Sequence, residues 1–302
     1  MNIEVSVVIP SYNSADTISA CLTSLMKQDY DKKFEITVVD SSTDNTRQIV
    51  TDGFPDVKLI SCKKKTDPGT ARNMGVNVSH GEYILFLDSD CIAGKDWINK
   101  ITGAYKNSDY DAVGGSIYPA NPETDVVGWA GYIAEFREFI PGHPSSIRSH
   151  LPTCNISYRR DKFLTTGSFN ADYYPQEDLF FNHHFTKNGF KIYFDPEIKI
   201  FHFHRNRLVY FLKHQKNIGY ITSSLLKKIE LDGSSLVRKK FLALISLPLL
   251  PLIKFYRTFT VFAKVNPAIL KKHIPSFLVF ALGLGPWTLG FAKGLFVPKF
   301  DE

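Results

Sequence analysis

The chain has 302 residues, 44% of them apolar, so it is long enough for one large or two modest domains with an ample core. Its formal net charge of +6 is unevenly spread: residues 205–302 hold 16 Lys and Arg against 4 Asp and Glu, whereas residues 1–204 hold 20 against 26. The C-terminal basic residues fall among long apolar runs. This pattern favours an anionic membrane surface as a partner and argues against a nucleic-acid binder.

The four cysteines lie far apart and show no Cys-x-x-Cys spacing, which argues against a zinc site or a disulfide framework. The N-terminal residues carry no basic run and lead directly into a strand-like segment, so we expect no secretory signal. Both features favour a reducing cytoplasm as the compartment.

The first third of the chain alternates β-rich apolar runs with helical patterns. The predicted strands are residues 5–10, 34–39, 57–61 and 83–87. Helical patterns cover residues 18–26 and the stretch that begins at Asp67-Pro68, which has the N-cap and first-turn chemistry of a helix. Strands that alternate with helices indicate an α/β fold with a mostly parallel sheet and right-handed crossovers.

The middle of the chain continues with fewer clear signals. The predicted elements are helices at 97–105, 179–188 and 207–228 and strands at 112–118, 151–158 and 198–204. Gly189 is expected to end the second of these helices in the C′ position. In the last strand, period-2 alternation places His202 and His204 on one face. Residues 119–152, rich in Pro, Gly and aromatic residues, are expected to form a loop or short helices.

Two carboxylates follow the most apolar predicted strand. Residues 83–87 are predicted to form a central strand buried on both faces, and Asp88 and Asp90 come directly after it with Ser89 between them. In open α/β sheets, ligands bind just beyond the carboxyl ends of the strands. Mg²⁺ typically takes one or two protein carboxylates together with phosphate oxygens and water. An isolated Asp-x-Asp is more often a solvated turn, so the prediction of a cation site depends on the other motifs.

Six short motifs occur in order, each at a predicted strand end or helix start. They are Val-Ile-Pro-Ser-Tyr-Asn at 8–13, Val-Val-Asp-Ser-Ser-Thr-Asp at 38–44, Gly-Thr-Ala-Arg-Asn-Met-Gly at 69–75, Leu-Asp-Ser-Asp at 87–90, Thr-Cys-Asn-Ile-Ser-Tyr-Arg at 153–159 and Gln-Glu-Asp at 176–178. Together they resemble glycosyltransferase family two, the inverting enzymes with the GT-A fold, over roughly residues 3–230. The tail resembles that of membrane-associated members.

The resemblance implies a GT-A (nucleotide-diphospho-sugar transferase) fold with a mostly parallel central sheet flanked by helices. The catalytic domain would span residues 1–230, with a donor half at about 1–118 and an acceptor half at about 119–230. Residues 231–302 would form a basic, hydrophobic, helical membrane-associated region.

The resemblance also implies a role for each matching position. The implied donor-binding residues are Pro10, Tyr12, Asn13, Asp40, Ser42, Gly69, Arg72, Asn73, Asp88 and Ser89. The implied acceptor-binding residues are Asn155, Gln176 and Glu177. Asp178 matches the catalytic base. Asp90 and His202 would hold Mg²⁺ or Mn²⁺, with Asp88 and His204 as further candidate ligands.

The implied reaction is a single displacement at C1 of the sugar. A bound cation would stabilise the departing nucleoside diphosphate, and Asp178 would take the proton of the attacking hydroxyl from the opposite face, which inverts the anomeric configuration. UDP-sugars are the favoured donors. The processive members' Gln-x-x-Arg-Trp motif is missing, because the comparable helix reads Gln-Lys-Asn-Ile-Gly at 215–219. Transfer of one sugar per encounter is therefore expected.

Ordinary structural roles compete with several of these assignments. Pro10 and Tyr12 suit strand-end packing, Asp40 could cap the following helix, and His202 could be a buried histidine with satisfied hydrogen bonds. The run Lys-Lys-Lys at 63–65 suits a solvated turn or a place near a diphosphate.

Two apolar segments in the tail bear on membrane binding. Residues 241–253 are 13 residues without a charge, too few to span a bilayer, and are broken by Pro248 and Pro251. Residues 274–292 are 19 residues without a charge, but their glycines and Pro286 weaken a plain spanning helix. We expect a tail embedded in or lying on the cytoplasmic leaflet, with a two-span hairpin, a buried helical lobe or an oligomer interface as alternatives. A membrane-held enzyme implies a lipid-linked or membrane-proximal acceptor.

Two other functions remain as alternatives. A sugar-phosphate nucleotidyltransferase would carry a glycine-rich loop after its first strand, where this chain has Pro-Ser-Tyr-Asn at 10–13. A catalytically silent, membrane-associated nucleotide-binding module would not need Asp88, Asp90 and Asp178 together.

Overall fold

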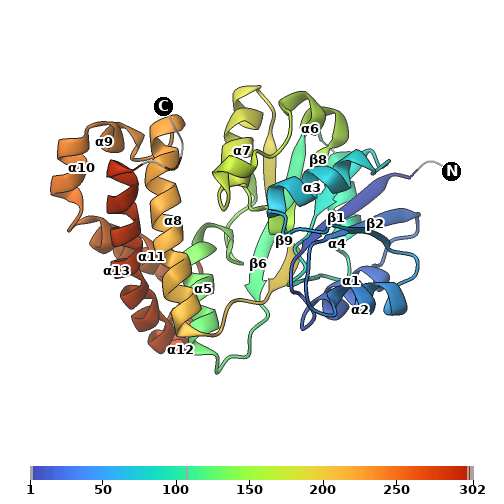
Figure 1. Cartoon of the computed structure of the whole chain (residues 1–302), viewed down its shortest axis with the longest axis horizontal. Coiled ribbons are helices and arrows are strands. Elements are labelled where there is room, and N and C mark those ends of the chain that lie inside the picture. Colours follow the sequence, from blue (N-terminus) through green and yellow to red (C-terminus); the bar gives the residue numbers. More distant parts are fainter. Residues whose placement is uncertain (1–2, 107, 298, 300–302) are drawn as a thin grey trace. The chain divides into compact units, whose positions relative to one another are not determined.

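The computed structural model describes residues 3–106, 108–297 and 299 (Figure 1). Its internal contacts divide the chain into two compact units. The first unit is Met1–Ala120 with Pro144–Phe203, and the second is Asn121–His143 with His204–Glu302. The segment 121–143 and the long helix after Phe203 both belong to the second unit.

The first unit is built on a nine-stranded sheet whose N-terminal part is parallel. Its first four strands are β1 (Val5–Ser11), β2 (Phe34–Asp40), β3 (Lys58–Ser61) and β4 (Tyr83–Phe86), in the order β3-β2-β1-β4. Every residue of β1 and β4 is buried, as expected for central strands rich in Val, Ile, Leu and Phe. The four strands predicted in this region are confirmed to within one residue.

The rest of the sheet is mixed. It consists of β5 (Cys91–Ala93), β6 (Ala112–Pro119), β7 (Ser146–Arg148), β8 (Ile156–Arg159) and β9 (Ile192–His202). β8 runs antiparallel between β4 and β6, β6 and β9 are parallel, and β5 and β7 each pair antiparallel with β9. Ile156 lies opposite Phe86, and His202 lies opposite Cys91. The end of β4, the start of β8 and the end of β9 therefore share one edge of the sheet.

A bulge interrupts β9 in its middle. Asp195 pairs with Gly115 of β6, but the next pair is Ser116 with Lys199, so residues 196–198 are looped out. The Ser116 hydroxyl donates to the Pro196 carbonyl at 2.6 Å, and a Cβ at Gly115 would overlap with carbonyls of the bulge. The strand β9 begins at Ile192, six residues before the strand predicted at 198–204. It ends at His202, so the prediction that His204 shares its strand face is wrong.

Helices flank the sheet as the alternating pattern predicts. They are α1 (Ile18–Met26), α2 (Thr46–Gly53), α3 (Pro68–Asn77), α4 (Trp97–Lys106), α6 (Arg160–Thr166) and α7 (Glu177–Lys187). Asp67 caps α3, because its Oδ1 accepts from the Thr70 amide at 2.9 Å and Pro68 stands at the first helical position. Gly189 follows α7 with φ +85°, as predicted from its C′ position.

The second unit is helical. Its helices are α5 (Val126–Glu135), α8 (Leu208–Lys228), α9 (Ser234–Arg238), α10 (Lys240–Ser246), α11 (Leu250–Val265), α12 (Pro267–Lys272) and α13 (Ile274–Phe296). α8 and α13 pack with their backbones nearly touching. A Cβ at Gly290 would overlap with the Lys216 carbonyl, and one at Gly219 would overlap with the Trp287 carbonyl. The glycines that weaken α13 as an isolated helix thus allow its close packing on α8.

The face of α13 that points away from α8 is apolar and exposed. Its residues, which we call the apolar stripe, are Ile274, Leu278, Leu282, Leu289 and Phe296. They are 58–65% exposed and recur at spacings of four and seven, so they lie along one side of the helix. α13 is also long and apolar enough to cross a membrane.

Candidate active site

Asp90, Cys91 and His202 form the candidate metal centre. Asp90 Oδ1 lies 3.5 Å from His202 Nε2 and 3.9 Å from Cys91 Sγ, and the three potential ligand atoms lie within 4.8 Å of one another. The Asp90 side chain is 44% exposed, so it can receive a ligand from solvent. Burial raises the pKa of the Cys91 thiol well above its ordinary value. The oxygen and nitrogen donors of Asp90 and His202 suit Mg²⁺ or Mn²⁺.

Sequence reasoning named Asp90 and His202 but missed Cys91. The cysteines were judged by their spacing alone, and Cys91 shares no spacing motif. Its position directly after Asp90 was the available signal.

Asp88 belongs to a network of two ion pairs in which Arg72 bonds both Asp88 and Glu177. Arg72 donates from NH2 to Asp88 Oδ1 at 2.6 Å and from NH1 to Glu177 Oε1 at 2.9 Å. Burial alone would lower the pKa of Arg72, but the two carboxylates raise it above its ordinary value, so Arg72 stays charged. Burial raises the pKa of Glu177, against the opposing effect of Arg72. These two ion pairs join the end of β4 to the start of α7.

Asp178 follows Glu177 in the first turn of α7, where a carboxylate is favoured by the helix dipole. Its Oδ2 accepts from the Thr153 amide at 3.2 Å, and its Oδ1 accepts from the Leu179 amide at 2.7 Å. Thr153 lies just before β8, whose first residue is opposite the last residue of β4.

The charges of the three predicted acidic residues raise the pKa of the same buried thiol, that of Cys154. The pKa of Cys154 is raised first by burial and then by the charges of Asp88, Asp90 and Asp178. The motifs at 87–90, 153–159 and 176–178 are near one another at the sheet edge, because Arg72 bonds both Asp88 and Glu177 and the Thr153 amide bonds Asp178.

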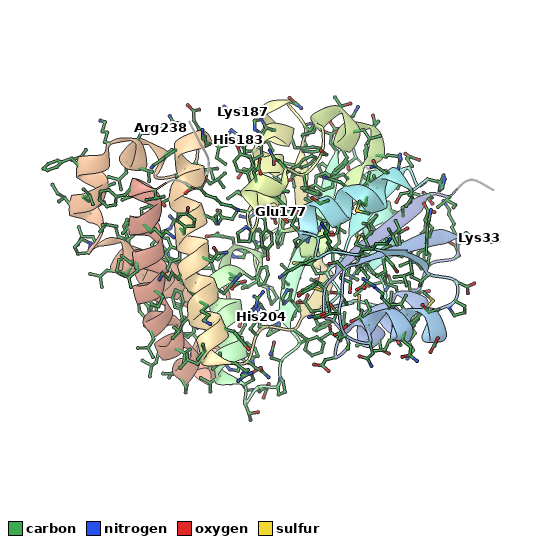
Figure 2. All side chains as sticks on the ribbon, in the orientation of Figure 1. Lys33, Glu177, His183, Lys187, His204 and Arg238 are labelled. Carbon is green, nitrogen blue, oxygen red and sulfur yellow. The ribbon has the colours of Figure 1, made fainter. Side chains whose placement is uncertain are left out.

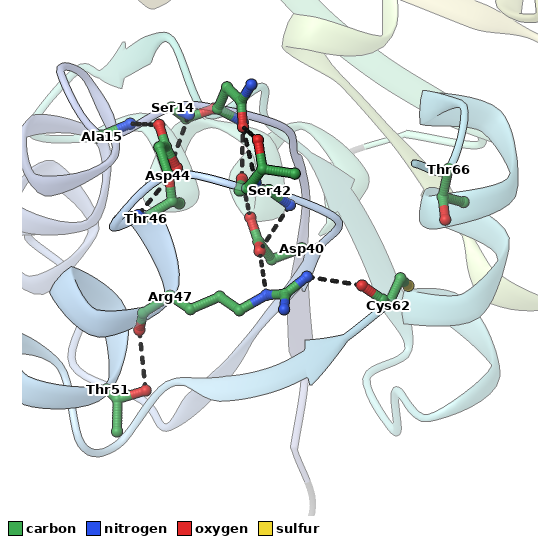
Figure 3. A network of polar contacts seen from close by, with 12 residues as sticks. Ser14, Ala15, Asp40, Ser42, Asp44, Thr46, Arg47, Thr51, Cys62 and Thr66 are labelled. Carbon is green, nitrogen blue, oxygen red and sulfur yellow. Dashed lines mark hydrogen bonds and ion pairs between the residues drawn. The ribbon is translucent and has the colours of Figure 1, made fainter. Parts of the chain in front are cut away.

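Asp40 is the centre of a polar network at the end of β2 (Figure 3). Its side chain is fully buried, and its oxygens accept hydrogen bonds from the Ser42 amide at 3.0 Å, the Ser42 hydroxyl at 2.5 Å and Arg47 Nε at 2.8 Å. Arg47 also donates to the Cys62 carbonyl at 2.6 Å. Asp40 does not cap α2, because Asp44 bonds the Thr46 amide there.

The loop after β1 is tied to this network. Asn13 has φ +52°, its amide donates to the Ser42 hydroxyl at 2.7 Å, and its Oδ1 accepts from the Thr43 amide at 2.9 Å. Next to it, the Tyr12 ring is 40% exposed, and Lys65 Nζ lies 4.2 Å from the ring centroid. The predicted nucleobase wall thus presents an aromatic face with a cation beside it.

Two other donor-side positions are buried. Pro10 lies within β1, and the Ser89 hydroxyl is 2.7 Å from the Ser14 hydroxyl. The sequence pattern did not single out Arg47 or Ser14, because each makes contacts with residues in other parts of the chain, whereas Lys65 lies in the Lys-Lys-Lys run that was expected in a turn or near a diphosphate.

The expected acceptor contact of Asn155 needs correction. Its side chain has no exposed surface, accepts from Trp97 Nε1 at 2.8 Å and donates to the carbonyls of Ser116 and Ile198 at 3.0 Å each. All of its amide groups are used inside the sheet, so Asn155 is a structural residue. Glu177 is likewise buried against Arg72 (Figure 2). Gln176 directly precedes α7 and is half-buried.

His204 is not in the candidate metal centre. It belongs to the second unit beside α5, where its ring packs against Tyr132 and Phe136 and its amide donates to Asn121 Oδ1 (Figure 2). Among the described residues, the group that could hold an ion contains His202 and not His204.

Two curated relatives show the range of the similarity. The chain is 27% identical over 199 residues to glycosyltransferase AglE of Haloferax volcanii, a match that covers 64% of this chain and 65% of AglE. The chain thus spans less than two thirds of that relative's length. It is 22% identical over 250 residues to a dolichyl N-acetyl-alpha-D-glucosaminyl phosphate 3-beta-D-2,3-diacetamido-2,3-dideoxy-beta-D-glucuronosyltransferase of Methanococcus voltae, with 74% of each chain covered.

Two solved structures share the fold. Staphylococcus aureus TarS 1-349 in complex with UDP-GlcNAc matches with a TM-score of 0.55 and 19% identity, covering 94% of this chain and 91% of that chain. The mannosyltransferase PcManGT from Pyrobaculum calidifontis, in complex with GDP-Man and Mn²⁺, matches with a TM-score of 0.63 and 16% identity, covering 99% and 88%. These likenesses confirm the predicted GT-A-like α/β fold.

The model of the family described as Glycosyl transferase family 2 matches residues 6–165, more than half of the chain. That range contains five of the six motifs, those at 8–13, 38–44, 69–75, 87–90 and 153–159. The chain therefore belongs to glycosyltransferase family 2 and is a transferase.

Proposed function

We propose that this protein is a metal-dependent, inverting glycosyltransferase that moves one sugar from a nucleotide-diphospho-sugar to a hydroxyl or phosphate of a lipid-linked or membrane-proximal acceptor. UDP-sugars are the favoured donors. The observation that carries the proposal is the placement of Asp88, Asp90 and Asp178 at one edge of the sheet: Arg72 bonds both Asp88, two residues before Asp90, and Glu177, the residue before Asp178.

On the donor side, the nucleotide would lie against the exposed Tyr12 ring and the loops that Asn13 and Ser42 tie together. Lys65, beside Tyr12, supplies a positive charge for an anionic donor. Asp90 and His202 would hold the divalent ion, which stabilises negative charge on the leaving diphosphate. Asp88 keeps its carboxylate near this position through its ion pair with Arg72.

On the acceptor side, Asp178 would serve as the general base. Two backbone amides fix its carboxylate, so the orientation of its proton-accepting oxygens is set before an acceptor arrives. A base of this kind typically contributes about 10²–10⁴-fold to the rate. With one base and no second carboxylate acting as a nucleophile, the reaction would be a single displacement with inversion.

The second unit favours an acceptor at a membrane. Residues 233–300 contain ten Lys and Arg and no Asp or Glu, and the apolar stripe of α13 lies within this stretch. An apolar helix face among basic residues suits insertion into an anionic leaflet. The Methanococcus voltae relative is named for a dolichyl phosphate-linked substrate, and an Escherichia coli relative, 40% identical over 100 residues, for a diphosphoundecaprenol-linked one. We place the enzyme on the cytoplasmic face of the membrane.

A thermal-shift panel tests the donor and the metal together. Purified protein is heated with UDP, GDP, UDP-GlcNAc, UDP-glucose and GDP-mannose, each with and without Mn²⁺. A ligand that binds only the folded state raises the free energy of unfolding by about 2.7 kcal/mol at 100 times its Kd. We expect a rise in Tm with UDP and a UDP-sugar that needs the cation. No shift with any nucleotide would refute the proposal, and an equal shift without cation would refute metal dependence.

A further inference from the structure

We infer that the start of α3 is a clamp that positions the segment carrying Asp178, and that Arg72 is a positioning residue and not a ligand of the donor. The inference rests on the proposed function, because it assigns Arg72 a part in placing the base. The clamp consists of Gly69, Arg72 and Asn73, which lie on one face of α3 at spacings of three and four residues.

Asn73 holds the beginning of the segment. Its Nδ2 donates to the Phe169 carbonyl at 2.8 Å, and its Oδ1 accepts from the Phe169 amide at 3.0 Å. Both backbone groups of Phe169 are thus bound by one side chain. The Phe169 ring is buried against Phe86 and Phe181, so this end of the segment is fixed to the core as well.

Gly69 and Arg72 hold the end of the segment. Arg72 donates to Glu177 at 2.9 Å, and Glu177 is the residue directly before Asp178. A Cβ at Gly69 would lie 3.0 Å from Glu177 Cγ and 3.2 Å from Phe169 Cβ, so glycine allows α3 to contact both ends at once. The two ends of residues 169–177 are therefore fastened to a single turn of α3.

The segment between these ends is held by local contacts: the Tyr173 ring stacks on Phe180 of α7, and the Gln176 amide donates to the Tyr173 carbonyl. Its short helix η3 (Ala171–Tyr173) contains no buried residue. Without the clamp, the first turn of α7 would lose its attachment to α3, while the buried side chains of Phe181 and Asn182 would still hold the following turn in the core. Because reaction rates are sensitive to displacements of about 1 Å, a loose segment would lower turnover.

The burial of Arg72 argues against a direct donor contact. Its side chain is 4% exposed, and NH1 and NH2 are both taken by carboxylates. Its Nε is enclosed, with no hydrogen-bond partner among the residues that the structure describes. A donor phosphate could reach this guanidinium only by displacing Asp88 or Glu177. The ion pair between Arg72 and Asp88 instead links the clamp to the donor side of the site. Arg72 therefore connects Asp88 with the segment that carries Asp178.

The test compares Arg72→Lys with wild type in three measurements. UDP affinity is measured by calorimetry with Mn²⁺, kcat and KM by UDP release from UDP-GlcNAc, and the mobility of residues 169–178 by amide hydrogen exchange. Lysine keeps the charge but cannot bridge two carboxylates as a guanidinium does. We expect UDP affinity to stay within about threefold of wild type, kcat to fall about 10- to 100-fold and exchange in this segment to accelerate.

Two further variants complete the design. Arg160→Lys is the matched control, because Arg160 is a partly exposed arginine whose guanidinium bonds the Val76 carbonyl at the other end of α3, and it should leave all three measurements unchanged. Asn73→Ala tests the clamp without touching Asp88 and should reproduce the faster exchange if Arg72→Lys does not fold.

The outcomes separate the clamp from the proposed function. A loss of UDP affinity of about tenfold or more with unchanged exchange would make Arg72 a donor ligand and overturn the inference. Unchanged exchange together with unchanged kcat would overturn it as well. If wild type released no UDP from UDP-GlcNAc, kcat could not be compared with that donor in the absence of its acceptor, and the UDP affinity and exchange measurements would still decide the clamp.

Discussion

His202 Nε2 and Asp90 Oδ1 lie 3.5 Å apart at the end of β9 and the turn after β4. The relationship depends on pairing between β5 and β9, which sets Cys91 opposite His202. An imidazole and a carboxylate at this distance can bind one cation from two sides. Loss of either side chain would leave the cation with one of these two protein ligands.

His202→Ala should weaken Mn²⁺ binding, so that the enzyme needs more Mn²⁺ for activity. Removing one of two protein ligands leaves the ion to Asp90, so we expect the Mn²⁺ concentration for half-maximal activity to rise about 10- to 100-fold. A Mn²⁺ titration of sugar transfer measures this. His184→Ala, which removes an exposed histidine on α7, should leave the titration unchanged. Equal Mn²⁺ dependence in wild type and His202→Ala would remove His202 from the metal centre.

Asp178→Asn should abolish most turnover while leaving nucleotide binding intact. The amide keeps the shape of the side chain but cannot accept the acceptor's proton, so kcat should fall about 10²–10⁴-fold. UDP affinity, measured by calorimetry, should not change. Asp172→Asn, a change to an exposed carboxylate in the same segment, serves as the control. Turnover of Asp178→Asn at the wild-type rate would show that another group is the base.

Leu278→Asn combined with Leu282→Asn should reduce membrane binding. Both side chains are about two thirds exposed on the apolar stripe (65% and 64%), so the change costs the folded protein little and removes apolar area from the surface. Burying a leucine is worth about 1.5–3 kcal/mol, so the double variant should bind vesicles of anionic lipid at least about tenfold more weakly. Flotation with such vesicles is the measurement.

Ile147→Asn is the matched control, since Ile147 is 55% exposed but lies on β7 of the first unit. If the control lost as much binding as the double variant, general loss of apolar surface would explain the result. Retained binding by the double variant would show that the apolar stripe does not face the lipid.

The contact between α8 and α13 should not tolerate a side chain at Gly290. A methyl group there would overlap with the Lys216 carbonyl and the Tyr220 amide, both of which are backbone, so the helices must move apart. We expect Gly290→Ala to lower the free energy of unfolding by about 1–3 kcal/mol. Gly285→Ala on the exposed side of α13 meets no atom within 4 Å and should raise it slightly, by about 0.5–1 kcal/mol. Thermal denaturation of both variants provides the comparison.

Glu135 should make the stability of the second unit depend on pH. Burial alone would raise its pKa, but His214, whose Nε2 lies 3.2 Å from Glu135 Oε1, and the nearby His204 and Arg205 lower it to about 2. Because the folded-state pKa lies below the ordinary value of 4.5, the ionised carboxylate stabilises the fold above about pH 4.5. This contribution is lost as the pH falls from about 4.5 to about 2.

Glu135→Gln should therefore destabilise the protein at pH 7 by about 1–3 kcal/mol and have progressively less effect as the pH falls below about 4.5. Unfolding by urea at several pH values measures the difference. A destabilisation that stayed constant down to pH 3 would contradict the role of the ionised carboxylate.

Much of the first unit follows from local sequence patterns. Asp67-Pro68 predicts the start of α3, Gly189 the end of α7, and the apolar run at 83–87 the buried strand β4, because each signal acts through neighbouring residues. The Asp88 and Asp90 pair could be placed at the sheet edge for the same reason.

The assignments that failed depend on contacts between distant residues. Asn155 looked like an acceptor contact within its motif, but Trp97, Ser116 and Ile198 use its whole amide group. His204 looked equivalent to His202 by alternation, but β9 ends between them. Helix α5 lies in the region expected to form a loop or short helices, and the sequence could not place it because it is almost fully buried and lacks the polar face that marks a helix.

The bulge in β9 determines the side of the sheet to which His202 points. Side chains along a strand alternate between two faces, and the bulge takes up three residues, an odd number, between the pairs at Gly115 and Ser116. Every residue of β9 after the bulge therefore faces the side of the sheet opposite to the one that uninterrupted pairing would give. The orientation of His202 depends on this change of parity, so shortening the bulge by one residue would turn the imidazole away from Asp90 and remove one of the two proposed metal ligands.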